Sequence, residues 1–161
     1  MRLPIITLLI ALCHTTLHAQ TDTKSKSVYV ELAGSGGLGS VNYEQDFYTF
    51  NKGELAWRGG FSIAPIDKNN GVGLVFPAMI HAKFGKGASQ LDTGIGQGFT
   101  ITTKGAFFML TTAAIGYRYQ KADSHWFYRA SYTPLISYLV DFQVQHWGGV
   151  TIGYTFKTAG K

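Results

Sequence analysis

The sequence predicts an all-β protein, a single antiparallel up-and-down transmembrane β-barrel of eight strands. Three observations support this fold class. The chain is rich in glycine and aromatic residues and poor in charged residues, a composition that suits many short strands joined by tight turns. Eight segments alternate apolar and polar residues with a period of two. The polar faces of these segments carry acidic and basic residues in equal number, which predicts a charged interior and an apolar exterior.

The composition narrows the class further. Glycine supplies 20 of the 161 residues, about one in eight, against a usual ~7%. Aromatic residues and charged residues each make up 14% of the chain. The formal net charge is +5, but the cations are scattered, so no basic run indicates a nucleic-acid partner. We expect these cations to be solvated at the rims of the barrel, where they could also contact the head groups of outer-membrane lipid.

Residues 1–19 are predicted to be a cleaved signal peptide. Arg2 supplies the positive start, and residues 3–12 form an apolar run too short to span a bilayer. Ala19 is the small residue expected before the cleavage site, and Cys13, the only cysteine, lies within the peptide. The mature chain would therefore contain neither disulfides nor thiolate metal sites. Its expected parts are a periplasmic leader at 20–27, the barrel at 28–156 and a C-terminal tail at 157–161.

The eight predicted strands are separated by clusters of Gly, Asn, Asp and Lys. They comprise residues 28–34, 38–47, 54–65, 71–84, 88–97, 107–120, 125–134 and 146–156. The last strand alternates most clearly, with Ile152 and Tyr154 on one face and Thr151 and Gly153 on the other. A rival interpretation of residues 106–115 is a buried helical turn. The run is too short and too rich in threonine to be a membrane helix.

The polar faces carry what we call the lumenal charge network. Its predicted members are Glu31, Glu44, Asp46, Arg58, Lys83, Asp92, Arg118 and Arg129. Eight ionised groups without partners would be prohibitively costly to bury, so we expect them to pair across the interior. Small residues on the same faces, such as Gly60 and Gly116, leave room for long side chains. The interior of an eight-stranded barrel is just wide enough for side chains, so paired charges would plug it.

Turn lengths and aromatic positions suggest how the barrel is oriented. Short turns at 51–53, 85–87 and 121–124 are expected on the periplasmic side, and the two longest connections, 98–106 and 135–145, on the outer side. Amphipathic rings near the inner rim would lie among lipid head groups. The residues concerned are Phe47, Trp57, Phe84, Tyr119, Trp126, Tyr128 and Phe156.

Several stretches resemble small outer-membrane β-barrel proteins of the Bacteroidetes type. They are residues 31–34 with 38–44 (LGSVNYE), 115–120 (IGYRYQ), 126–135 (WFYRASYTPL) and 148–156 (GGVTIGYTF). The resemblance implies the fold, an outer-membrane location and transient contact with the barrel assembly machinery, but no substrate or catalytic set. One departure is that residues 157–161 follow Phe156, whereas such barrels often end on the aromatic residue that the machinery recognises.

Residue types that could support catalysis or metal binding have simpler interpretations. Asp123, Ser124 and His125 resemble the parts of a hydrolytic triad, but adjacent strand residues point to opposite faces, so a turn is preferred. His81, His125 and His146 lie on three predicted strands without the carboxylate spacing of a metal site. No catalytic, cofactor-binding or metal-binding residue is therefore predicted.

The preferred hypothesis is a non-enzymatic barrel with a structural or surface-interaction role. Residues 34–37 resemble a phosphate-binding loop only superficially, because no helix follows them, and are interpreted as a hairpin connection. One alternative is a membrane-embedded lipid-modifying or hydrolytic enzyme, in which His81 or His125 would meet a serine. A small-solute channel and a soluble periplasmic barrel that binds an apolar ligand are weaker alternatives. Loop residues 97–104 and 137–146 would give access to the enzyme or the channel.

Overall fold

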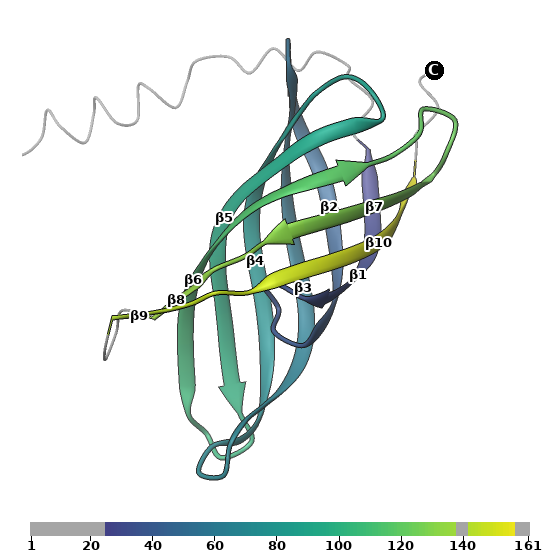
Figure 1. Cartoon of the computed structure of the whole chain (residues 1–161). Helices are drawn as coiled ribbons and strands as arrows, with labels where there is room; N and C mark the ends of the chain where they lie inside the picture. Colours follow the sequence, from purple (N-terminus) through teal and green to yellow (C-terminus); the bar gives the residue numbers. More distant parts are fainter. Residues whose placement is uncertain (1–24, 138–141, 157–161) are drawn as a thin grey trace, which may run out of the picture.

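The computed structural model of the chain describes residues 25–137 and 142–156. The expected signal peptide, most of the leader and the C-terminal tail lie outside the described residues. Every regular element within those ranges is a β-strand, as Figure 1 shows. The same ranges contain no helix with the length and apolar character needed to cross a membrane.

Ten strand segments follow one another along the chain. They are β1 (Lys26–Ala33), β2 (Gly39–Phe50), β3 (Gly53–Asp67), β4 (Gly71–Phe84), β5 (Ser89–Thr102), β6 (Phe107–Tyr119), β7 (Trp126–Tyr132), β8 (Leu135–Ser137), β9 (Gln143–Gln145) and β10 (Gly148–Phe156). Strand β1 begins at Lys26, two residues before the expected start of the barrel at Val28.

Eight of these strands close into a ring. Strands β1 to β7 each pair antiparallel with their chain neighbours, and β10 pairs with both β7 and β1. The closing ladder between the two ends of the chain runs from Lys26↔Phe156 to Ala33↔Gly149. The predicted closed, eight-stranded, antiparallel barrel is confirmed.

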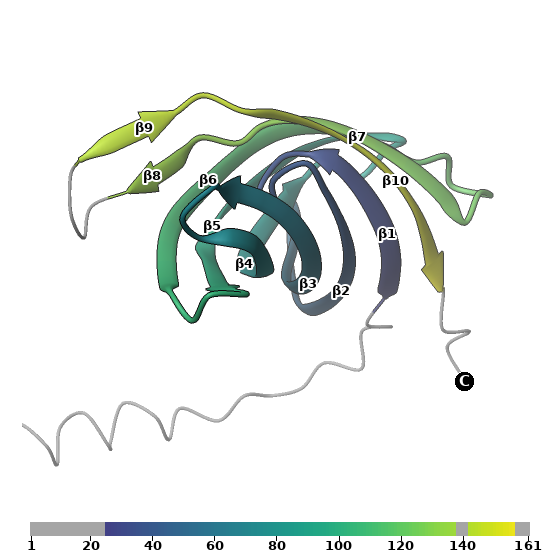
Figure 2. The same cartoon turned by 90° about the horizontal axis from the view of Figure 1, so that it is seen from below.

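The two remaining strands lengthen the barrel at the end where β5 joins β6, which we call the outer end, and the opposite end we call the inner end. Strand β8 continues the course of β7 and pairs with β6, and β9 continues into β10 (Figure 2). Pairing between β6 and the β7–β8 course is interrupted between Tyr132 and Leu135 and resumes in the same register, since Pro134 has no N–H to donate to a ladder. The predicted outer loop at 135–145 was therefore partly wrong, because a short hairpin occupies both of its ends.

The predicted loop at 98–106 was also wrong over its first half. Strand β5 runs on to Thr102, with Thr100 and Thr102 buried and Ile101 exposed, so the alternation continues past the expected end at Gln97. The loop was expected to begin at Gly98, which instead lies within β5. Glycines in this strand lie where neighbouring atoms come close, since a Cβ on Gly96 would lie 2.2 Å from the Ala78 carbonyl oxygen.

The polarity of the wall is inverted relative to a soluble protein. On the outer face Ile95 is 64% exposed and Val150 58% exposed, whereas Glu31 and Arg118 inside are 0% and 1% exposed. A soluble barrel that binds apolar ligands would need the reverse arrangement. An apolar exterior around a polar interior is the arrangement of a barrel embedded in lipid.

Candidate functional site within the barrel

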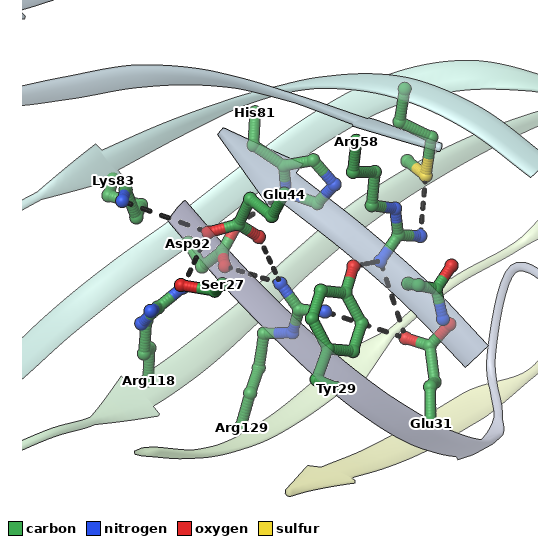
Figure 3. A network of polar contacts seen from close by, with 12 residues as sticks. Ser27, Tyr29, Glu31, Glu44, Arg58, His81, Lys83, Asp92, Arg118 and Arg129 are labelled. Carbon is green, nitrogen blue, oxygen red and sulfur yellow. Dashed lines mark hydrogen bonds and ion pairs between the residues drawn. The ribbon is translucent and has the colours of Figure 1, made fainter. Parts of the chain in front are cut away.

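The interior is built by the inward faces of the ring strands. Strands β1 to β7 all contribute at least one member of the lumenal charge network, because every second residue of a strand points inward. All eight members are buried, with Asp46 the most exposed at 5%. Figure 3 shows most of them gathered in one cluster together with Tyr29 and His81. The strands thus place acids and bases from distant parts of the sequence within reach of one another.

Glu44 on β2 lies at the centre of the network. Arg118 on β6 donates a hydrogen bond from Nη1 to its Oε1 over 2.7 Å, and Arg129 on β7 donates from Nη1 to its Oε2 over 3.4 Å. The ammonium nitrogen of Lys83 lies 3.7 Å from Oε1. One buried carboxylate therefore compensates three cations from three other strands.

Lys83 on β4 connects the network to the inner end of the barrel. Its Nζ lies 2.6 Å from Oδ1 of Asp46 and 3.1 Å from Oε2 of Glu54. Asp46 also accepts a hydrogen bond from the Ser25 hydroxyl. Glu54 is 38% exposed and was not predicted as a member. Glu54 stands next to a predicted turn, so its contact with Lys83 was not expected.

Asp92 on β5 binds one cation and one histidine. Arg129 donates from Nη1 to Oδ2 over 2.9 Å, and Nδ1 of His81 lies 2.6 Å from Oδ1. The other ring nitrogen of His81, Nε2, is buried and has no hydrogen-bond partner. The alternative in which His81 meets a serine therefore has no support in this geometry.

Arg58 on β3 forms the outer end of the network. It donates from Nη1 to the Tyr29 hydroxyl over 2.9 Å and lies 3.5 Å from Oε1 of Glu31. Arg58 also donates to the hydroxyl of Ser35, which in turn donates to Oε2 of Glu31 over 3.2 Å. Ser35 belongs to the connection between β1 and β2, so this connection reaches into the lumen.

We call residues 34–37 the glycine loop. Gly34 and Gly37 have φ angles of +88° and +86°, which residues with a side chain rarely adopt. A Cβ on Gly34 would lie 2.7 Å from Cδ of Glu31, and one on Gly149 would lie 3.0 Å from Cα of Gly34. The loop is the predicted hairpin connection, but it folds inward and caps the charge network from the outer side.

Two aromatic rings lie among the buried charges. The guanidinium carbon of Arg118 is 3.7 Å from the centroid of the Phe127 ring, and that of Arg129 is 4.7 Å from the Tyr29 centroid. Both distances suit attraction between a cation and a ring face. We had not predicted either ring, although each stands two residues before a network member, Glu31 or Arg129, and so shares its inward face.

A cavity of about 260 Å³ lies beyond the glycine loop, at the outer end of the lumen. Its walls are mostly apolar and come from β3 to β6, β8 and the segment before β10. The residues that define it are Ala64, Val75, Gly98, Leu110, Leu135 and Trp147. The lumen therefore changes from charged to apolar along its length, with the glycine loop at the boundary.

The other candidate residues remain apart. Ser124 accepts a hydrogen bond from the backbone N–H of Trp126, while His125 donates from Nδ1 to the carbonyl oxygen of Thr155 over 2.9 Å. His146 bonds to the Tyr132 hydroxyl near the outer hairpin. Over the described ranges no three His, Cys, Asp or Glu side chains gather in a way that could hold a metal ion.

Comparison with known proteins supports the fold. No protein-family model matches the chain, and no curated protein sequence does so either. The N-terminal β-barrel domain of Pseudomonas aeruginosa OprF aligns with a TM-score of 0.56 at 12% identity, over 83% of this chain and 96% of that chain. Ail, the attachment invasion locus protein of Yersinia pestis, aligns with a TM-score of 0.46 at 13% identity, over 83% and 97%. The likeness to the OprF domain concerns the barrel fold alone.

Proposed function

We propose that this chain is an outer-membrane β-barrel whose lumen is closed by paired charges and whose role is structural or surface-interactive. The observation that carries the proposal is the burial of four acids and four bases inside a wall whose exterior is apolar. After export through a cleaved signal peptide, the barrel would be inserted by the assembly machinery of a Gram-negative outer membrane. Membership of the Bacteroidetes-type family is part of the proposal and rests on the resemblance of the sequence stretches named above.

Strand closure supports the membrane location. In hydrocarbon every backbone polar group must be satisfied within the protein, and only helices and closed barrels achieve this. The ladders of β10 with β1 and with β7 join the first and last strands, so the ring of eight strands has no free edge. Exposed rings such as Trp126 and Phe156 at the inner end suit the head-group region.

The arrangement of the lumen argues against conduction. Side chains from opposite walls meet at Glu44 and Asp92, and the glycine loop covers them on the outer side through Ser35. Moving an ion past this point would require breaking buried ion pairs, which is costly. A filled lumen is also what the size of an eight-stranded barrel favours.

The same geometry gives little support to an enzyme. Covalent catalysis needs a nucleophile within hydrogen-bond reach of a base. Nε2 of His81 has no such partner, and Ser124 and His125 are each bonded to backbone groups. We assign the surface-interaction role to the outer hairpins and the structural role to the charge network.

The proposal is tested by fractionation and conductance on one preparation. The full chain, expressed in a Gram-negative host, should enter the outer membrane and change gel mobility when boiled in detergent. Purified barrel in a planar bilayer should give no regular current steps, with a general porin as positive control. Soluble recovery without a mobility shift, or regular steps, would overturn the proposal. Lipid hydrolysis abolished by His81→Ala or by His125→Ala would favour the enzyme instead.

A further inference from the structure

The outer cavity differs from the rest of the lumen in its chemistry. Ala64 and Val75 are buried on its walls, and Leu110, Leu135 and Trp147 complete an apolar lining. The glycine loop separates this space from the charged groups beneath it. Cavities with mostly apolar walls and few polar groups are the usual form of small-ligand sites.

The barrel wall beside this cavity is incomplete. The ladder between β1 and β10 ends at Ala33↔Gly149, because the chain then turns inward as the glycine loop. The other side of the barrel continues through Trp147 into β9, which pairs with β8 along one edge. In the part of the chain that the structure describes, no strand pairs with the opposite edge of β9. Leu38 lies next to this interruption.

A groove on the outer wall reaches the same place. It is lined by Leu32, Ala130, Tyr132, Val150 and the backbone of Gly148 and Gly149, and it shares Leu38 with the inner cavity. Leu32 and Leu38 are 59% and 56% exposed. Gly148 is exposed and has no side chain to fill this part of the outer face, whereas Gly149 faces the glycine loop inside. The groove belongs to the apolar wall, so it is continuous with the surface that would contact lipid.

We propose that the outer cavity accommodates one acyl chain of a membrane lipid, which enters sideways past Leu38. The apolar lining matches a hydrocarbon chain, and the gap in the strand ladder opens toward the lipid-facing groove rather than toward the charged lumen. Gln145 is exposed at the margin of the cavity and would lie toward the lipid ester region, whereas Ser35 on the lumen side is already bonded to Arg58 and Glu31. This inference rests on the membrane location proposed above and adds a ligand class to it.

Trp147 provides a direct reporter. The chain contains three tryptophans, and replacing Trp57 and Trp126 by Phe leaves Trp147 as the only one. In vesicles containing phosphatidylcholine brominated on its acyl chains, its fluorescence should be quenched relative to unlabelled vesicles. Gly98→Leu and Ala64→Phe should each reduce the quenching by more than about half, because they fill the volume in which the chain would lie. At Gly98 an added Cβ meets only ordinary contacts, the nearest at 3.8 Å, so the strand accepts the larger residue.

Val72→Phe is the matched control, since Val72 lies on the outer face of β4 and is 40% exposed. Quenching should stay unchanged in it. Equal quenching in the control and the filling variants would overturn the inference, because lipid would then reach Trp147 only from outside. Quenching by a water-soluble brominated alcohol without quenching by the labelled lipid would also overturn it and assign the cavity to an external ligand. The gel mobility shift of each variant reports folding. A variant set that keeps the shift but shows no specific quenching would contradict acyl-chain binding alone, whereas loss of the shift in the unmodified chain would contradict the membrane location.

Discussion

Glu44 shows at the scale of one residue why the interior depends on pairing. Its carboxylate accepts from Arg118 and Arg129 and lies near Lys83, and it is 1% exposed. Three cations from different strands would repel one another without it. A buried ion pair contributes little by comparison with an apolar pair, but removing one partner leaves charges without compensation. Replacing Glu44 alone is therefore expected to lower the stability of the barrel strongly.

Glu44→Gln should lower the free energy of unfolding by about 3–5 kcal/mol, the usual cost of breaking a buried pair from one side. Unfolding by urea in lipid vesicles, followed by tryptophan fluorescence, measures the change. Glu54→Gln is the control, because Glu54 contacts the same Lys83 at 3.1 Å but is 38% exposed. Its loss should stay under about 1 kcal/mol. Equal losses in the two variants would contradict a role for Glu44 at the centre of the network.

Alternation alone predicted an inward position for the eight network residues, and the structure places each of them inside. Their structural role stays a prediction. The same rule applied to every inward position would have added Tyr29 and Phe127, but only the charged and small residues of the polar faces were considered. Which acid meets which base could not be predicted, because the partners depend on the stagger between strands. That stagger is visible only in the ladders, such as Glu44↔Arg58 and Lys83↔Asp92.

The glycine loop is the element whose conformation the sequence least predicted. A short run of glycine and serine suggested a connection, but nothing in its pattern indicated that it would fold into the lumen and bind Arg58. The last residues of β5 and the presence of β8 were also not predicted. A loop was expected from Gly98 onward, and Pro134 ended the alternation without ending the course of the strand. Long strands with clear alternation were predicted well, because successive side chains of a strand point to opposite faces whatever the strand packs against.

Gly34→Ala should destabilise the barrel by about 1–3 kcal/mol, since a residue with a side chain would be strained at this positive φ. The added Cβ would also approach the Glu31 carboxyl at 2.7 Å. Gly87→Ala in the turn between β4 and β5 is the control, because an added Cβ there has no heavy atom within 4 Å. Its effect should remain within about 0.5 kcal/mol. Urea unfolding in vesicles compares the two, and indistinguishable midpoints would show that the loop does not need its inward conformation.

At the scale of the whole molecule, the closed wall and the layered lumen have separate roles. Closure satisfies the backbone and lets the exterior be apolar, while the charge network fills the inner and central lumen. The incomplete ladder near β9 confines any opening to the outer end, where the charges give way to apolar side chains. Such a molecule can be rigid in its centre and still expose a distinct surface at its outer end.

The apolar exterior of the wall gives a test of the proposed membrane location at this scale. Ile95 lies in the middle of β5 and is 64% exposed, so Ile95→Arg would place a charge near the bilayer centre. We expect a loss of about 2–4 kcal/mol in unfolding free energy in vesicles, falling to about 0–1 kcal/mol for a charge near the interface. Phe107→Arg supplies the second case, because Phe107 is 61% exposed at the outer end of β6. A soluble barrel would tolerate both arginines alike, since each would lie in water, so equal and small effects would contradict the membrane location.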